Sequence, residues 1–330
     1  MKQFVRKVKI TGTGSFVPET IYTNQFLETI IETSDAWIQE NLGIKERRIA
    51  DKNQTTSDLA AGAGERAIKN AGLTPENIDL IIVATATPDR KAPSTACIVQ
   101  HKLNARNAVA FDIAAVCSGF LFAMSTAAQF IASGVYDHVL VIGADKFSGI
   151  TDWKRRDAVF FGDGAGAAVL SHEEGNDGFL AFRLYSDGSG QSNFTIPGGG
   201  SEIPLTKDNI DEGLQYFLMN GREVYNTGTK VLPQAILQVL DDTGLQIKDI
   251  DLMIPHQPSI AILRKTAEII GLPFDKVMTN MDRYANTSGG TIPILLDEVN
   301  RQGKLVKGKN ILFAAVGSGW TWGAAIIKWS

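Results

Sequence analysis

Cys117 stands at a point in the sequence where a thiol can do chemistry. It lies in the stretch FDIAAVCSGFLFAM, between a short apolar run and a longer apolar segment of helix-compatible residues. A cysteine at a helix N-terminus feels the positive end of the helix dipole, which stabilises a thiolate and is expected to lower the thiol pKa. From position alone, Cys117 fits equally well as a nucleophile or as a small buried hydrophobic residue.

One further cysteine and four histidines complete the set of thiol and imidazole groups. Cys97 falls within a helix-like segment capped by Ser94, and we interpret it as structural. His256 lies between two prolines in IPHQP, directly after an apolar strand-like run, whereas the other histidines lie in polar segments. A rigid, partly buried position favours a functional role for His256.

The elements that position these groups occur twice along the chain. AIKNAGLTPENIDLIIVAT and VLDDTGLQIKDIDLMIPHQ share a pattern, and their glycines, Gly72 and Gly244, are 172 residues apart (244 − 72). The strand-like runs VLVIG and ILFAA begin at Val139 and Ile311, again 172 apart (311 − 139). A constant offset indicates an internal duplication.

The duplication predicts two halves, residues 1–173 and 174–330, that meet in the polar segment SHEEGNDG. Each half alternates helix-like and strand-like segments, which is typical of an α/β fold with helices on both faces of largely parallel sheets. The segment 186–221 is rich in glycine and weakly periodic. A long irregular segment in a compact fold is usually functional, so we expect it to roof a substrate channel.

The duplication also predicts where the chemistry takes place. An offset of 171 (288 − 117) pairs Cys117 with Ser288 in YANTSGGTIP. His256 follows a strand-like run, and the carboxyl ends of strands are where α/β folds gather functional groups. We therefore expect Cys117, His256 and Asn286 to face one pocket.

Composition excludes several classes of function. The 330 residues are 44% hydrophobic and 21% charged, with a formal net charge of −4, so no global basic field attracts nucleic acid. The N-terminus MKQFVRKVKITGTG lacks the apolar region of a signal peptide, and no apolar run is long enough to span a membrane. We therefore expect a cytoplasmic protein with reduced thiols. The sequence has no metal-ligand spacing, and FGDGAGAAVL lacks the spacing of a phosphate loop.

The motifs TSDAWI, AAVCSGF, GDGAGAAVL, PHQPS, YANTSGGTIP and GSGWTWGAA together resemble the β-ketoacyl-acyl-carrier-protein synthase III family of the thiolase-like superfamily. The resemblance implies a duplicated fold, a five-layered αβαβα sandwich with mixed sheets, in a homodimer. It also implies a triad of Cys117, His256 and Asn286. Members move an acyl group from a thioester to the cysteine and condense it with a malonyl thioester, with loss of carbon dioxide.

The same resemblance implies further site residues and no cofactor, because acyl thioesters of coenzyme A or of acyl-carrier protein are the substrates. Backbone N–H groups of Cys117 and of the turn Gly317, Ser318 and Gly319 are expected to form an oxyanion hole. Positions that hold coenzyme A and its pantetheine arm fall on Thr33, Trp37, one of Arg155 or Arg156, Gly221 and Ser259.

Four positions depart from the common family pattern. Ser259 replaces an asparagine and Ala261 replaces an arginine associated with carrier-protein docking. Asn41 stands where some members have a phosphate-contacting arginine, so coenzyme A is expected to bind weakly or the donor to be a carrier protein. Ala92 stands where many members place a phenylalanine that enters the partner's acyl pocket, which predicts primers longer than acetyl.

Carrier-protein docking is assigned to a local basic patch with three members, namely Lys230, Arg264 and Lys265.

Two other functions stay open. An acyltransferase of the same fold would pass the Cys117-bound acyl group to a non-malonyl acceptor in secondary metabolism, and the altered motif HQPSIA keeps this alternative open. A non-catalytic partner subunit is the other, although such subunits usually lose triad residues and this chain retains all three.

Overall fold

The computed structural model describes residues 6–172, 174–175 and 177–330. The predicted boundary between the halves involves residue 173, which lies outside the described residues. In the described part of the chain, no helix has both the length and the apolar character needed to cross a membrane.

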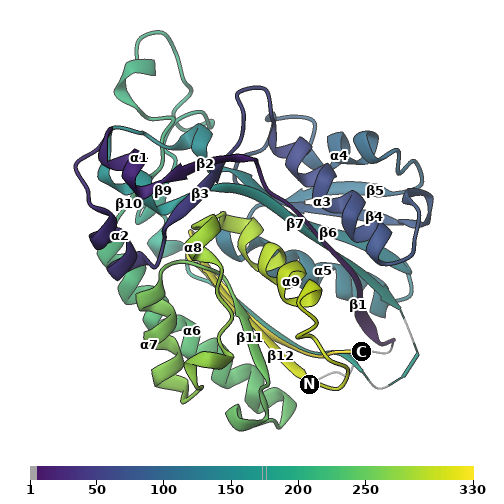
Figure 1. The fold of residues 1–330 in the computed structure, drawn as a ribbon. Helices are drawn as coiled ribbons and strands as arrows, with labels where there is room; N and C mark the ends of the chain where they lie inside the picture. The colour runs from purple at the N-terminus through teal and green to yellow at the C-terminus, as the bar shows by residue number, and fades with distance from the viewer. Residues whose placement is uncertain (1–5, 173, 176) are drawn as a thin grey trace.

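Two mixed sheets form the frame of the molecule (Figure 1). The first has the strand order β1-β7-β6-β4-β5, in which β4 runs parallel to β5 and β6. The second has the order β11-β12-β13-β8, in which β11 and β12 are parallel. The strands of the first sheet are β1 (Val8–Phe16), β4 (Leu80–Ala84), β5 (Val109–Ile113), β6 (His138–Lys146) and β7 (Asp163–His172); those of the second are β8 (Gly178–Ser186), β11 (Leu252–Pro255), β12 (Asn310–Gly317) and β13 (Thr321–Lys328).

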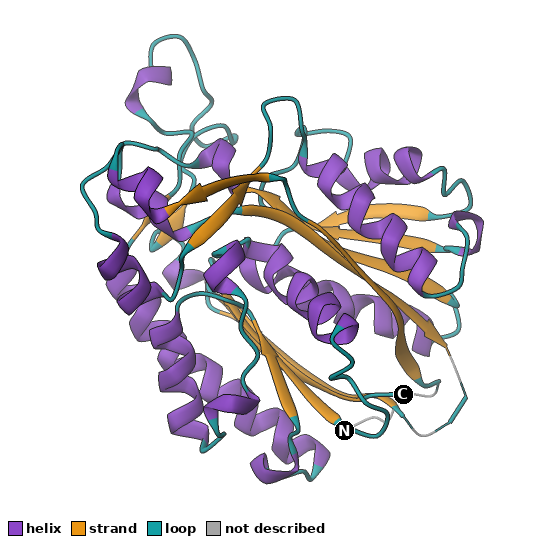
Figure 2. Ribbon diagram, in the orientation of Figure 1, coloured by secondary structure: helices purple, strands orange, loops and turns teal. Residues whose placement is uncertain are grey.

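Helices fill three layers around these sheets, as Figure 2 shows. One pair packs on the outer face of the first sheet, one pair lies between the sheets, and one pair packs on the outer face of the second sheet. The five-layered αβαβα sandwich predicted from the resemblance is therefore confirmed. The three pairs are α3 (Thr56–Asn70) with α4 (Thr95–Leu103), α5 (Gly119–Ala132) with α9 (Thr291–Arg301), and α6 (Gly221–Thr243) with α7 (Ile260–Ile270).

Burial explains the local sequences of these elements. The central strand β4 reads LIIVA and is buried at every position, as expected for a parallel strand covered on both faces. Helix α5 reads GFLFAMSTAAQFIA, and its apolar residues extend almost all round because a sheet lies on either side. Shorter elements surround the site: β2 (Thr20–Thr23), β3 (Glu46–Ile49), β9 (Phe194–Thr195), β10 (Leu218–Met219), α1 (Asn24–Glu28), α2 (Asp35–Leu42) and α8 (Met281–Tyr284).

The duplication is visible in the backbone, and it corrects one predicted pairing. The 3-10 turns Val116–Ser118 and Ser288–Gly290 lie 172 residues apart (288 − 116), and each leads directly into a central helix. The first residue of each turn has a positive φ, 45° at Val116 and 51° at Ser288. Cys117 is thus the structural equivalent of Gly289, one residue beyond the predicted Ser288.

Candidate active site

Cys117 lies at the N-terminal end of α5, in the turn that follows β5. Its side chain is buried, and its Sγ lies 3.7 Å from the Ser288 Oγ of the other half. Burial raises the pKa of the Cys117 thiol to about 12; the hydrogen bond with Ser288 opposes this rise, and the nearby Asp145 carboxylate adds to it. The predicted lowering of the Cys117 pKa by the helix dipole is therefore wrong, because loss of water outweighs it.

His256 directly follows β11, as the sequence predicts, and it is almost completely buried. Its backbone N–H donates to the Ala314 carbonyl at 2.8 Å, which extends the β11–β12 pairing by one residue. Its ring Nδ1 lies 2.7 Å from the hydroxyl of Thr291, the first residue of α9. Burial lowers the pKa of His256 to about 3, so the imidazole is neutral at neutral pH.

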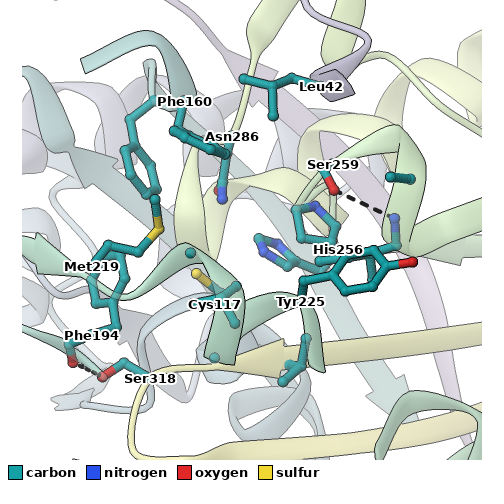
Figure 3. Close-up of a pocket in the computed structure, with 18 of the residues that line it drawn as sticks. Leu42, Cys117, Phe160, Phe194, Met219, Tyr225, His256, Ser259, Asn286 and Ser318 are labelled. Atoms are coloured by element: carbon teal, nitrogen blue, oxygen red, sulfur yellow. Dashed lines mark hydrogen bonds between the residues drawn. The ribbon is translucent and has the colours of Figure 1, made fainter. Parts of the chain in front are cut away.

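Asn286 is held by its backbone on both sides. Its N–H donates to the Phe160 carbonyl at 3.1 Å, and its carbonyl accepts from the Gly162 N–H at 3.0 Å. Its side-chain Oδ1 accepts from the Ser288 N–H at 2.8 Å, which assigns the amide orientation because a backbone N–H only donates. The Nδ2 group is then the one directed toward Cys117 and His256, as Figure 3 shows.

Gly317, at the end of β12, allows the backbone of the second half to approach Cys117 closely. A Cβ at position 317 would lie 3.0 Å from the backbone nitrogens of both Cys117 and Ser118. Gly317 and Ser318 line the same cavity as Cys117, and the Ser318 hydroxyl donates to the Phe194 carbonyl at 2.6 Å. Gly319, assigned with them to the oxyanion hole, lies in the following turn and does not line the cavity.

Cys117, His256 and Asn286 face one cavity of about 380 Å³ (Figure 3). Its lining is mostly apolar and aromatic and contains no Asp, Glu, Lys or Arg among the described residues. The irregular segment 186–221 contributes to this wall, as predicted. The lining residues that it supplies are Phe194, Met219 and Gly221.

A second, shallower pocket adjoins the cavity at Trp37, whose side chain belongs to both walls. Thr33 and Arg156 line this pocket, and the Arg156 guanidinium lies 4.4 Å from the centre of the Trp37 ring system. Of the two adjacent arginines, Arg156 is thus the one that lies beside Thr33 and Trp37. Arg155 points elsewhere: it donates to the Phe217 carbonyl at 2.9 Å and forms an ion pair with Asp157.

Two positions assigned to the pantetheine arm, Gly221 and Ser259, line the main cavity. The Ser259 hydroxyl caps α7 by accepting the Ile262 N–H at 3.4 Å. Ala261 and Asn41 line the same cavity, so three of the four departures from the family pattern, with Ser259, face it.

Other assigned residues lie away from this cavity. Ala92 is exposed on the loop before α4 and does not line the cavity of its own chain. Lys230 is exposed on α6, and on α7 Arg264 packs over the Phe274 ring while Lys265 pairs with Glu268 at 2.9 Å. Their roles in acyl binding and docking stay predictions.

The structure also changes the interpretation of two groups. Cys97 is exposed on α4 rather than packed in a core, unlike the buried Cys117. Sequence reasoning missed Asp145, a fully buried carboxylate that accepts hydrogen bonds from Thr85, Ala86 and Thr87 and from the Gly289 N–H. A charged residue at the end of the apolar strand β6 was the available signal.

Comparisons with known proteins agree on one family. Two family models match, the 3-oxoacyl-[acyl-carrier-protein] synthase III model over residues 111–188 and the C-terminal model of the same family over residues 240–329. The chain is 48% identical to a beta-ketoacyl-[acyl-carrier-protein] synthase III of Caldanaerobacter subterraneus over 97% of both chains. It is 45% identical to that of Clostridium acetobutylicum, over 99% of this chain and 100% of that protein.

A crystal structure of 3-oxoacyl-[acyl-carrier-protein] synthase III from Aquifex aeolicus has the same fold. It is 41% identical to this chain and superposes with a TM-score of 0.90, over 98% of this chain and 100% of that one.

Proposed function

This chain belongs to the 3-oxoacyl-[acyl-carrier-protein] synthase III family, and from that premise we propose that it loads an acyl group onto Cys117 and condenses it with a malonyl thioester. It is an acyltransferase-type enzyme of fatty-acid synthesis that carries out a Claisen condensation. The observation that supports the proposed roles is the convergence of Cys117, His256 and Asn286 on one apolar cavity.

In the first half-reaction the Cys117 sulfur attacks a thioester carbonyl. The negative charge that develops on the carbonyl oxygen needs N–H donors, and the Cys117 amide lies beside Gly317, which has no side chain to cover it. The apolar lining excludes water, which protects the acyl-enzyme from hydrolysis.

In the second half-reaction a malonyl thioester loses carbon dioxide and becomes an enolate that attacks the acyl-enzyme. The enolate oxygen needs hydrogen-bond donors, and Asn286 Nδ2 is oriented to supply one of them. His256 is placed to supply the other once Nε2 carries a proton. Decarboxylation itself generates the carbanion, so no strong base is required.

The donor and the primer are the finer parts of the proposal. An uncharged Asn41 offers no charge-assisted contact to a coenzyme A phosphate, which favours an acyl-carrier-protein donor. The primer is longer than acetyl, because each buried CH₂ gains about 0.8 kcal/mol in an apolar cavity and Ala92 leaves space in the partner's pocket. Lys230, Arg264 and Lys265 remain our docking patch for the carrier protein.

The homodimer and the cytoplasmic location belong to the same proposal. In the described part of the chain β5 is an edge strand of the first sheet, and Val109 at its start is 50% exposed. A second copy that pairs with this strand would continue the sheet and bring the Ala92 loop toward the partner's cavity.

The test is acylation followed by condensation. The protein is incubated with acyl thioesters of two to twelve carbons, on coenzyme A and on carrier protein, and its mass and the modified peptide are measured. We expect one acyl group on Cys117 in the wild type and in Cys97→Ser, and none in Cys117→Ala. Malonyl thioester should then release carbon dioxide and yield a 3-oxoacyl product.

Two results would change the proposal. Acylation of Cys117 without release of carbon dioxide from malonyl thioester would favour the acyltransferase with a non-malonyl acceptor. A folded protein with a free thiol that accepts no acyl group from any donor would favour the non-catalytic subunit.

A further inference from the structure

The hydrogen bonds around Thr291 assign the proton of the His256 ring. The Thr291 hydroxyl donates to the Ser288 carbonyl oxygen at 2.9 Å, and a carbonyl oxygen only accepts. The same hydroxyl lies 2.7 Å from Nδ1 of His256. Because its one hydrogen is already used, the hydroxyl accepts from Nδ1–H. A neutral imidazole that carries its proton on Nδ1 presents a lone pair at Nε2.

The fold itself does not require a hydroxyl at this position. The duplication places Gly119 at the position equivalent to Thr291 (291 − 119 = 172) and Ala84 at that of His256 (256 − 84 = 172). In the first half these two small residues are in contact, since a Cβ on Gly119 would lie 3.0 Å from the Ala84 Cβ. The hydroxyl therefore occurs where the histidine occurs, which indicates a role toward that ring.

The surroundings of the His256 ring allow its Nε2 lone pair to accept a proton from Cys117. No charged side chain lines the cavity among the described residues, and burial keeps the Cys117 thiol protonated. A protonated thiol is a weak nucleophile and needs a neutral acceptor for its proton. In the described lining, His256 is the titratable nitrogen that can provide one.

We propose that Thr291 is a positioning residue that holds His256 as the Nδ1–H tautomer, so that Nε2 takes the proton of the Cys117 thiol when the sulfur attacks the thioester. This inference rests on the proposed function and deepens it. The proton moves from Sγ to Nε2 as the bond from Sγ to the carbonyl carbon forms. It then moves from Nε2 to the donor's sulfur as the bond between that sulfur and the carbonyl carbon breaks, and the ring is neutral again.

The same tautomer fixes the proton balance of the condensation. A neutral ring with its proton on Nδ1 has no N–H to offer an enolate oxygen at Nε2. The one solvent proton that decarboxylative condensation consumes therefore enters on Nε2 together with the malonyl carboxylate. The imidazolium stabilises the enolate, and the proton finally passes to the Cys117 thiolate that leaves when the new carbon–carbon bond forms.

Nitrogen NMR tests the tautomer directly, without any activity. Protein labelled with ¹⁵N-histidine has four imidazole spin systems, and the His256→Gln variant identifies the one of interest. We expect a protonated Nδ1 and an unprotonated Nε2 in the wild type at neutral pH. A protonated Nε2 would overturn the inference while leaving acylation of Cys117, and with it the proposed function, intact.

Variants of Thr291 test the consequence. Thr291→Val should slow acylation of Cys117 about 10²-fold, the lower end of general-base contributions, and should move the ring proton toward Nε2. Thr291→Ser keeps the hydroxyl and should stay within about threefold of the wild type. The matched control is Thr266→Val, because Thr266 is buried in a helix and its hydroxyl has no hydrogen-bond partner in the described structure.

A second readout separates the base from mere structural damage. In a Cys117→Ala background only decarboxylation of malonyl thioester remains. A His256 ring with its proton on Nε2 can donate to the enolate oxygen. Adding Thr291→Val to this background should therefore keep the decarboxylation rate within about threefold. Wild-type acylation by Thr291→Val would overturn the inference, as would equal losses in both reactions. If Thr291→Val does not fold, the His256 tautomers measured by NMR in the wild type and in Thr291→Ser decide whether the inference stands.

Discussion

Replacing Gly317 with alanine tests where the thioester oxygen binds. The added Cβ would lie 3.0 Å from the Cys117 nitrogen, 3.0 Å from the Ser118 nitrogen and 3.1 Å from the Ala115 oxygen. These distances are shorter than ordinary contacts of a methyl group, so the alanine would cover the Cys117 N–H and shift the turn. We expect the variant to lose the Cys117 amide as a donor to the developing oxyanion.

The magnitude follows from two separable effects. Loss of one donor in an oxyanion hole costs about 10² to 10³-fold in rate, or about 2.7–4 kcal/mol of transition-state stabilisation. Crowding a packed site costs roughly 1–3 kcal/mol of folding stability. The first effect appears in the acylation rate of the folded enzyme and the second in its melting temperature.

The assay is single-turnover acylation of Cys117 at saturating donor, followed by intact mass, with thermal unfolding measured in parallel. Gly149→Ala is the matched control, because a Cβ there meets no atom within 4 Å and its φ is not positive. It should acylate at the wild-type rate. If folded Gly317→Ala acylates within threefold of the wild type, the Cys117 amide is not the oxyanion donor and the reasoning fails.

Two further predictions concern substrate choice and acid stability. Asn41→Arg should lower KM for coenzyme A thioesters with little change in kcat, because the added charge strengthens ground-state binding. Asn41→Gln, the uncharged control, should leave KM unchanged. Steady-state kinetics with coenzyme A and carrier-protein donors distinguishes the two variants. Burial holds the pKa of His256 at about 3 in the folded protein, against an ordinary value of 6.5, so the unfolded chain binds a proton that the folded one excludes. Its contribution to the free energy of unfolding is therefore constant above pH 6.5 and falls by up to about 1.4 kcal/mol per pH unit between pH 6.5 and 3. Unfolding against pH should show a shallower acid loss in His256→Gln, whereas His101→Gln, at an exposed position, should behave like the wild type.

The α/β architecture could be predicted well because both of the patterns that indicate it are present in the order of the residues alone. Buried runs such as LIIVA and the repeated offset of 172 depend only on residue order, and they sufficed for two α/β halves with Cys117 and His256 at the ends of strands. The offset of 171 between Cys117 and Ser288 was wrong by one residue as an equivalence, because the two turns begin at Val116 and Ser288, although the two side chains do face each other at 3.7 Å.

What the sequence could not predict depends on contacts between distant residues. Arg155 and Arg156 are neighbours in the sequence, but in the fold Arg155 donates to the Phe217 carbonyl and Arg156 lies over Trp37. The pKa of Cys117 depends on how much water reaches it, which a helix position alone does not determine. The exposed face of Cys97 likewise depends on which side of α4 packs on the sheet.

The duplication gives an independent argument for the oxyanion position. Gly289 is the equivalent of Cys117 (289 − 117 = 172), and its N–H donates at 3.0 Å to a carboxylate oxygen of Asp145. The equivalent of Asp145 in the second half is Gly317 (317 − 145 = 172), which has no side chain to reach the Cys117 N–H. The amide of the second-half turn thus donates to an oxygen that the first half supplies, whereas the equivalent amide of Cys117 in the first half lies beside Gly317, which supplies no side-chain oxygen. A substrate oxygen at the Cys117 amide would take the place that the Asp145 carboxylate oxygen takes at the Gly289 amide.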